Sequence, residues 1–208
     1  MSAVDRIRQV GILPVVRASS PQEAMAAVEA IRAGGIPILE ITMTVPGAIK
    51  IIAELSGIDA LIGAGTVLDA DTARRCVDAG ARFIVSPSLD IPTIEACRAL
   101  DIPCFPGAMT PTEIVTAWKA GATAVKVFPA NAVGGPTFLK SVKAPLPQIE
   151  LIPTGGVSLK TVGDFIAAGA FAVGVGADLV DLAAVRRGDT ASITAKAREY
   201  VAAVAAAR

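Results

Sequence analysis

Apolar residues in this chain gather in short unbroken runs, and longer stretches between the runs mix apolar and polar positions with helical spacing. Short apolar runs without alternation are typical of strands that are buried on both faces, as the strands of a parallel sheet are. The pattern predicts eight such strands: Ile12 to Arg17, Ile36 to Thr42, Ala60 to Thr66, Arg82 to Ser86, Pro103 to Pro106, Thr123 to Phe128, Glu150 to Thr154 and Phe171 to Gly176.

The stretches between these strands carry signals for the starts and ends of helices. Three starts combine a capping side chain with proline or an acid in the first turn, at Ser20-Pro21, Asp69-Ala70 and Thr110-Pro111. A recurring Ala-Gly pair closes a helix and opens the next strand, with the glycine expected as a left-handed C-cap, at Ala33-Gly34-Gly35, Ala79-Gly80, Ala120-Gly121 and Ala168-Gly169. The last helix is expected from Ile193 through Arg208.

Strict alternation of strand and helix predicts a parallel sheet. About eight units of roughly 25 residues each favour a closed TIM (β/α)8 barrel, formed as a single domain over residues 1–208. The main alternative is an open Rossmann-like sheet, which needs a glycine fingerprint after its first strand. Residues 17–20 read Arg-Ala-Ser-Ser and carry none.

Composition narrows the classes of partner and of chemistry. The 19 basic and 19 acidic side chains cancel without forming a basic stripe, which argues against nucleic acid and anionic membrane as partners and favours a small molecule. Histidine is absent, so the commonest general base and zinc ligand are missing. Any chemistry must therefore use Lys, Glu, Asp, Thr or Arg.

The three cysteines and the N-terminus indicate a cytoplasmic location. Cys76, Cys97 and Cys104 are odd in number and widely spaced, so we expect packing residues in a reducing compartment, with neither a disulfide framework nor a metal site. The N-terminal residues lack the apolar core of a signal peptide. No segment reaches the roughly 18 uninterrupted apolar residues of a membrane span.

Two charged residues lie inside apolar strands, where a solvated charge has no place. Lys126 lies in the run from Ala124 to Pro129, and Glu40 lies in the run from Ile36 to Thr42. Burial lowers the pKa of a lysine toward the range in which the free amine attacks a carbonyl, and a carboxylate in the same cavity can move protons. The simpler alternatives are a lysine whose head reaches water at a strand end, and a glutamate that serves only as an ion-pair partner.

The period of a strand places these groups on one face. Lys126 shares its face with Ala124 and Phe128, whereas Val125 and Val127 face the helices; Glu40 shares its face with Ile38 and Thr42. Both charged groups are therefore expected to point into the barrel near the carboxyl ends of the strands, where such barrels carry their active sites.

Arg17 and Thr66 occupy the corresponding late positions on the first and third strands. For Arg17 the alternative is a salt bridge at the rim, for example to Glu40. For Thr66 it is a hydroxyl that caps the next helix.

Two glycine-rich turns follow the seventh and eighth strands, at residues 153–157 and 173–177. Loops in these positions frequently bind phosphate through backbone N–H groups, because glycine allows close approach. Tight turns also need glycine for their own geometry, so the turns alone are weak evidence.

Taken in order over nearly the whole chain, several blocks of sequence resemble the 2-keto-3-deoxy-6-phosphogluconate (KDPG) aldolases and the 4-hydroxy-2-oxoglutarate (KHG) aldolases. The blocks are residues 39–42, 62–67, 83–87, 106–107, 125–129, 153–157 and 173–176. The resemblance implies a class I aldolase that reversibly cleaves such a substrate to pyruvate and an aldehyde, either glyceraldehyde 3-phosphate or glyoxylate. It further implies a homotrimer and no metal or other cofactor.

The resemblance also implies roles for particular residues. Lys126 would form the imine with the keto acid, and Glu40 would move protons during imine formation and carbon–carbon cleavage. Arg17 and Thr66 would hold the pyruvate carboxylate and neighbouring oxygens, and Pro87 and Phe128 would form apolar walls. The residues expected around the distal phosphate are Thr154, Gly155, Gly156 and Gly176.

This chain departs from patterns found in parts of the family at two positions. Thr44 stands where some members carry an arginine four residues after the catalytic glutamate, so carboxylate binding falls more heavily on Arg17. Ala177 stands where many members place a serine after the last glycine of the eighth-strand turn. Losing that hydroxyl gives weight to unphosphorylated 4-hydroxy-2-oxo acids as substrates.

Two other functions remain open. A phosphosugar isomerase or epimerase on the same barrel would use Glu40 for acid–base chemistry and Lys126 only as an electrostatic clamp. An assembly scaffold would use the alanine-rich last helix as a subunit face, with catalysis incidental, although ordinary packing against the barrel explains those alanines better.

Overall fold

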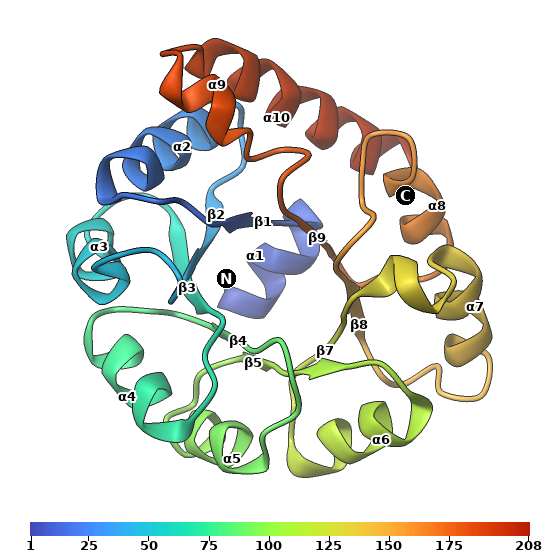
Figure 1. The fold of residues 1–208 in the computed structure, drawn as a ribbon. Coiled ribbons are helices and arrows are strands. Elements are labelled where there is room, and N and C mark those ends of the chain that lie inside the picture. The colour runs from blue at the N-terminus through green and yellow to red at the C-terminus, as the bar shows by residue number, and fades with distance from the viewer.

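The computed structural model describes residues 1–208, in which short parallel strands form a curled sheet inside a ring of helices (Figure 1). The strands are β1 (Ile12–Val16), β2 (Ile38–Thr42), β3 (Leu61–Gly65), β4 (Ile84–Val85), β5 (Cys104–Phe105), β6 (Gly107–Ala108), β7 (Val125–Val127), β8 (Leu151–Pro153) and β9 (Val173–Val175). Six of them pair in the order β5-β4-β3-β2-β1-β9, and the other three in the order β6-β7-β8. The predicted α/β class with a parallel sheet is confirmed.

The two sheets approach each other at both ends. A single parallel bridge joins Thr154 to Gly174 beyond β8, and the Phe171 N–H donates to the Leu151 carbonyl at 2.9 Å. At the other junction, β5 and β6 are consecutive pieces of chain that are separated only by Pro106. The ladders are thus interrupted at two places, and closure into a complete barrel stays a prediction.

All eight predicted strand regions contain a strand, but the strands are shorter than predicted. The fifth region was expected to end at Pro106, whereas a separate strand, β6, follows at Gly107–Ala108. Proline has no N–H to donate to a ladder, and this explains the break. The Pro106 carbonyl still accepts a hydrogen bond from the Lys126 N–H at 2.8 Å.

The helices surround the strands, except for α1, which lies at the centre of the view behind them (Figure 1). They are α1 (Ala3–Val10), α2 (Pro21–Ala33), α3 (Ala48–Leu55), α4 (Ala70–Asp78), α5 (Ile91–Ala99), α6 (Pro111–Ala120), the 3-10 turn η1 (Ala130–Val133), α7 (Pro136–Lys143), α8 (Val162–Ala167), α9 (Leu182–Arg186) and α10 (Thr190–Ala206). The three predicted N-caps are confirmed, because Ser20, Asp69 and Thr110 each accept a hydrogen bond from a backbone N–H in the first turn.

A helix ends at, or one residue before, the alanine of all four predicted Ala-Gly pairs. Gly80, Gly121 and Gly169 have φ of 106°, 105° and 92°, in the left-handed region that glycine favours. The expectation for Gly34 was wrong: its φ is −82°, and the left-handed residue is Gly35, with φ of 94°. With two glycines in succession, the helical geometry continues for one more residue before the chain turns.

The last helix begins earlier than predicted. Helix α10 starts at Thr190 rather than Ile193 because Asp189 caps it, accepting a hydrogen bond from the Ser192 N–H at 3.2 Å. It ends at Ala206, two residues before the predicted end at Arg208.

The apolar side chains form an inner and an outer cluster, and alternation along the strands separates them. The outer cluster, between strands and helices, includes Val125 and Val127, whereas Ala124 belongs to the inner cluster. The other inner residues are Ile7, Leu13, Ile38, Leu61, Phe83, Val85, Phe105, Ile152, Phe171 and Ala172. The predicted division of faces on the Lys126 strand is therefore confirmed.

Helix α1 was not predicted from the sequence, although a capping box marks its start. The Ser2 hydroxyl accepts from the Asp5 N–H, and the Asp5 carboxylate accepts from the Ser2 N–H. Ile7 of this helix is fully buried in the inner cluster, among residues near the starts of the strands. Apolar packing thus fills the amino-terminal end of the sheet and leaves the carboxyl end for polar groups.

The three cysteines are buried and unpaired, as expected of packing residues. None of the helices combines the length and apolar character that crossing a membrane requires.

Candidate active site

Lys126 is buried at the middle of β7, between β6 and β8. Its backbone is in register with Gly107 on one side and Ile152 on the other. The residue is only 2 % exposed, and its Nζ lies 5.2 Å from the centroid of the Phe128 ring. The alternative of a lysine whose head reaches water is therefore wrong.

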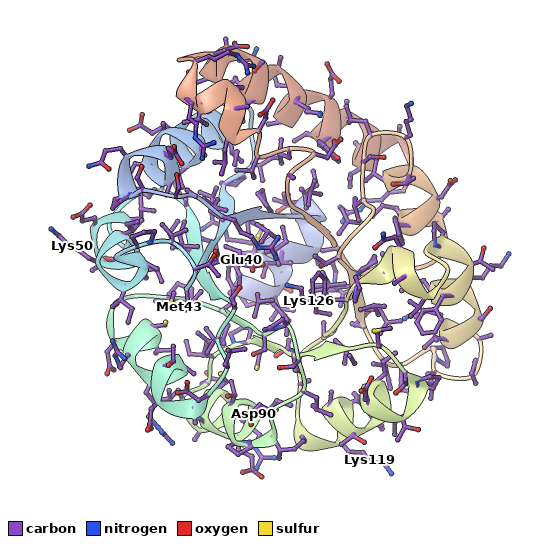
Figure 2. The ribbon with its side chains drawn as sticks, in the orientation of Figure 1. Glu40, Met43, Lys50, Asp90, Lys119 and Lys126 are labelled. Carbon is purple, nitrogen blue, oxygen red and sulfur yellow. The ribbon has the colours of Figure 1, made fainter.

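Glu40 is the second buried charge, on β2, and it is 1 % exposed. Neither of its carboxylate oxygens accepts a hydrogen bond, so the alternative of a glutamate that serves only as an ion-pair partner is wrong as well. A buried polar atom without a partner is expensive, and such atoms concentrate at functional sites. Figure 2 shows Glu40 and Lys126 within the ring of strands, whereas Lys50 and Lys119 lie on its outer side.

A glycine on the neighbouring strand makes room for the Glu40 carboxylate. Gly65 ends β3, and a Cβ added there would collide with Oε1 and with Cδ of Glu40. The two strands are in register, with Glu40 opposite Gly63 and Thr42 opposite Gly65. The carboxylate therefore rests directly against the β3 backbone.

Burial shifts the pKa values of these two groups toward each other. It raises the pKa of the Glu40 carboxyl, and the positive charges of Lys126 and Arg17 oppose that rise. It lowers the pKa of the Lys126 ammonium; the Glu40 charge opposes the fall, and the Arg17 charge adds to it. A free amine and a protonated carboxyl both become accessible closer to neutral pH than they would be in water.

Arg17 lies at the rim, immediately after β1, and its side chain is exposed. It forms no ion pair with any carboxylate, so the alternative of a rim salt bridge to Glu40 is wrong. Its charge nevertheless acts on both Glu40 and Lys126. The structure thus brings these three predicted site residues together.

Thr66 follows β3 with φ of 58°, a left-handed conformation that is rare for a β-branched residue. It does not cap the next helix, because Asp69 holds that position in α4. The alternative interpretation of Thr66, as a hydroxyl that only caps the next helix, is therefore wrong. Strain of this kind, of order 1–3 kcal/mol, clusters at functional sites.

The two predicted apolar walls follow β4 and β7, which belong to different sheets. Pro87 follows β4 and is half-buried, and its carbonyl packs so close to Gly107 that a Cβ on this glycine would collide with it. Phe128 follows β7 on the face of Lys126 and is likewise half-buried. Both border the inner face at the carboxyl end of the sheet.

The glycine-rich turns lie side by side at the ends of β8 and β9. Thr154, which is 4 % exposed, is bridged to Gly174, and a Cβ on Gly174 would collide with its hydroxyl. Gly155 and Gly156 have φ of 96° and 74°, so this turn requires glycine. Gly176 follows β9 and lies next to the Arg17 guanidinium.

Sequence reasoning assigned no role to three polar residues around this site. The Ser86 hydroxyl, directly before Pro87, is buried without a hydrogen-bond partner. Asn131 in η1 packs against the turn at Gly155 and Gly156. The buried Thr42 hydroxyl donates to the Val16 carbonyl at 3.0 Å. The apolar pattern identified the charged residues, but it carries no signal for a small polar residue that tertiary packing buries.

No three side chains among His, Cys, Asp and Glu gather in a way that could hold a metal ion. The available chemistry is that of a buried amine and a buried carboxyl, with an arginine at the entrance. Together with the position at the carboxyl ends of parallel strands, this arrangement is that of an α/β enzyme acting on a carbonyl compound.

Comparisons with known proteins identify the family. The model of the family described as KDPG and KHG aldolase matches residues 4–196. A 2-dehydro-3-deoxy-phosphogluconate aldolase from Pseudomonas aeruginosa is 35 % identical, covering 92 % of this chain and 88 % of its own. A KHG/KDPG aldolase from Escherichia coli is 33 % identical, covering 91 % and 90 %.

A solved structure agrees. KDPG aldolase from Legionella pneumophila, with pyruvate captured as a covalent carbinolamine intermediate, has a TM-score of 0.88 and 31 % identity, covering 95 % of this chain and 97 % of that one. This chain belongs to the KDPG and KHG aldolase family, and the protein is an aldolase, an enzyme of the lyase class. Family membership favours this function over the isomerase and the scaffold.

Proposed function

We propose that the protein releases pyruvate from a 4-hydroxy-2-oxo acid through an imine on Lys126, with Glu40 as the group that moves protons. The observation that carries the proposal is the burial of this amine and this carboxyl inside the ring of strands, with neither carboxylate oxygen hydrogen-bonded. A lysine with a lowered pKa and a carboxyl with a raised pKa suit a nucleophile and an acid–base catalyst.

The steps follow from the chemistry of imines. The neutral Lys126 amine attacks the ketone carbon to give a carbinolamine, and protonation of its hydroxyl by Glu40 releases water and leaves a protonated imine. Glu40 then removes the proton of the C4 hydroxyl, the C3–C4 bond breaks, and its electrons enter the imine to form an enamine. The aldehyde departs, C3 regains a proton, and hydrolysis releases pyruvate and the free lysine.

The rim residues hold the near end of the substrate in this proposal. Arg17 binds the pyruvate carboxylate, and its exposed position without an ion pair leaves its guanidinium available. Thr66 contributes a hydroxyl from its left-handed turn, and Pro87 and Phe128 exclude water from the reacting carbons.

The far end of the substrate would lie at the glycine-rich turns. Thr154, Gly155, Gly156 and Gly176 form this subsite, in which backbone N–H groups meet the anionic end of the molecule. Ala177 offers no hydroxyl there and is exposed. We therefore propose that this subsite binds either the phosphate of a KDPG-type substrate or the distal carboxylate of KHG.

We also propose an organisation for the molecule as a whole. Residues 1–208 form one domain, and the two sheets together form a (β/α)8 barrel, supported by the bridge between Thr154 and Gly174. A homotrimer is supported by the exposed apolar side chains of Leu68, Met109 and Trp118, and a cytoplasmic location by the three unpaired cysteines. Catalysis needs no metal, because the protonated imine itself accepts the electrons of the broken bond.

Replacing the nucleophile tests the proposal. In Lys126→Ala, pyruvate release from KDPG and from KHG should fall roughly a thousandfold or more, because no other group can form the imine. In Lys119→Ala, which removes an exposed lysine on α6, it should be unchanged. A Lys126→Ala protein that is folded and keeps a substantial part of the activity would contradict the proposal and favour the isomerase.

A further inference from the structure

The chain after β9 forms the part of the rim that faces Arg17. We call residues 176–186, from Gly176 through the end of α9, the rim segment. A Cβ placed on Gly176 would lie 3.6 Å from Nη1 of Arg17, so the arginine passes over the start of this segment. Thr154, at the end of β8, is bridged to Gly174 just before it. The segment therefore borders the subsite proposed for the far end of the substrate.

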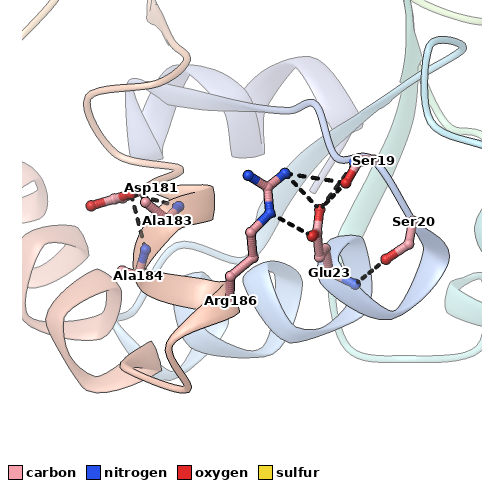
Figure 3. Close-up of polar contacts among 7 residues, drawn as sticks. All are labelled: Ser19, Ser20, Glu23, Asp181, Ala183, Ala184 and Arg186. Atoms are coloured by element: carbon pink, nitrogen blue, oxygen red, sulfur yellow. Dashed lines mark hydrogen bonds and ion pairs between the residues drawn. The ribbon is translucent and has the colours of Figure 1, made fainter.

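A group of hydrogen bonds, which we call the first tie, joins Arg186 at the end of the rim segment to Ser19 and Glu23 at the start of α2 (Figure 3). Nε of Arg186 donates to Oε1 of Glu23 at 2.8 Å, and its Nη2 donates to the Ser19 hydroxyl at 3.1 Å. Glu23 also accepts from the Ser19 N–H at 3.0 Å and from the Ser19 hydroxyl at 2.7 Å. Ser19 is two residues from Arg17, so this tie links the Arg17 loop to α9.

A second set of polar contacts, which we call the second tie, joins Asp178 near the start of the segment to Tyr200 and Lys196 of α10. The Tyr200 hydroxyl donates to Oδ2 of Asp178 at 2.6 Å, and Nζ of Lys196 lies 3.3 Å from the same oxygen. Tyr200 is fully buried, so its hydroxyl is held in a fixed direction by the packing around its ring. Asp178 is two residues from Gly176, and this contact anchors the chain where the distal subsite begins.

We propose that Tyr200, Glu23 and Arg186 are positioning residues that hold the rim segment in place around the far end of the substrate. This inference rests on the proposed function, because it concerns the same site. Neither tie includes Lys126 or Glu40. The ties therefore govern binding of the far end of the substrate, and formation of the imine with pyruvate, which has no distal group, is independent of them.

Tyr200→Phe and Arg186→Gln test the two ties separately. In each, KM for KDPG cleavage should rise about three- to tenfold, because one or two hydrogen bonds that orient the segment are lost. The value of kcat should stay within about twofold, and the rate at which borohydride traps the pyruvate adduct should not change. Arg186→Lys keeps the charge at the first tie and should restore most of the affinity.

Thr194→Ala is the matched control on the same helix as Tyr200. It removes a hydrogen bond of 2.9 Å from α10 to the Ala30 carbonyl, away from the rim segment. If KM is unchanged in both tie variants, or rises equally in Thr194→Ala, the inference is wrong. Should Tyr200→Phe not fold, the exposed tie in Arg186→Gln alone decides the outcome. Failure of the wild type to form a pyruvate adduct would instead overturn the proposed function.

Discussion

Burial lowers the pKa of the Lys126 ammonium, and the proposed role of this residue as a nucleophile depends on that shift. Removing an ammonium from water costs several kcal/mol unless the group is paired or becomes neutral. The partial solution in this protein is a second buried group, Glu40, whose charge raises the pKa of the lysine while burial lowers it. Each charge thus offsets part of the effect of burial on the pKa of the other group.

Ala177→Ser tests how this chain chooses between phosphorylated and unphosphorylated substrates. Adding a hydroxyl beside Gly176 should raise kcat/KM for KDPG relative to KHG by about fivefold to tenfold, because a hydrogen bond to a charged group contributes roughly 1–1.5 kcal/mol or more. The ratio is measured by pyruvate release from each substrate. Ala205→Ser, an exposed position on α10, is the control and should leave the ratio unchanged. An unchanged ratio in Ala177→Ser would place the anionic end elsewhere.

At the residue scale, the sequence predicts charged groups better than polar ones. Lys126 and Glu40 are evident because each interrupts an apolar run, and apolar runs indicate burial. Ser86 and Asn131 are not evident, because a serine after a strand or an asparagine in a turn is ordinary in any loop. Their burial or packing depends on contacts between segments far apart in the chain, which no local pattern records.

Strand β3 is built to admit side chains from its neighbours. Gly63 faces the Phe83 ring and Gly65 faces the Glu40 carboxylate, and a Cβ at either position would collide. Two glycines in a five-residue strand weaken it in isolation. Pairing with β2 along the whole length of β3 stabilises the strand.

Gly65→Ala should therefore damage both stability and activity. The added methyl displaces Glu40, and overpacking of this kind costs about 1–3 kcal/mol of the free energy of unfolding. Pyruvate release should fall roughly tenfold or more, because a misplaced proton carrier loses much of its effect. Gly57→Ala is the matched control: it is exposed, and nothing lies within 4 Å of the new Cβ. Urea denaturation measures the free energy of unfolding, and the pyruvate-release assay measures activity. Equal stability and equal activity of the two variants would contradict the account.

At the element scale, the order of strands and helices follows from the sequence, but their limits do not. Every predicted strand region contains a strand, because hydrophobic runs and capping residues are local signals. The break at Pro106 and the early start of α10 at Asp189 depend on which hydrogen bonds the folded chain completes. Helix α1 shows the same limit, since its role in covering the starts of the strands appears only with the inner cluster.

The whole molecule is held together by contacts between the first and last parts of the chain. Arg186 binds Glu23 near the N-terminal strand, and Arg208 donates hydrogen bonds to the Arg8 and Gln9 carbonyls of α1. Strand β9 pairs with β1, so the two ends of the chain meet within one sheet. The repeating strand–helix units of the sequence predict a closed ring. They do not demonstrate closure, because it depends on contacts between segments that lie far apart in the chain.

The contact between Glu23 and Arg186 predicts a loss of stability in acid. Hydrogen bonds from Arg186 and Ser19 lower the pKa of Glu23 from 4.5 to about 2, so the folded protein binds fewer protons than the unfolded chain between these values. The contribution is complete above pH 4.5 and is lost as the pH falls toward 2. The Tm of the wild type, measured by circular dichroism, should therefore fall further between pH 5 and pH 3 than the Tm of Glu23→Gln does. An equal loss in both proteins would contradict this assignment.

Trapping of the imine tests the central claim most directly. Incubation with pyruvate and borohydride near neutral pH, followed by intact mass and peptide mapping, should show a single reduced adduct on Lys126. Burial lowers the pKa of Lys126 and so favours its free amine, which is the form that attacks a carbonyl. Absence of an adduct on folded protein, or an adduct spread over exposed lysines with none on Lys126, would contradict the account.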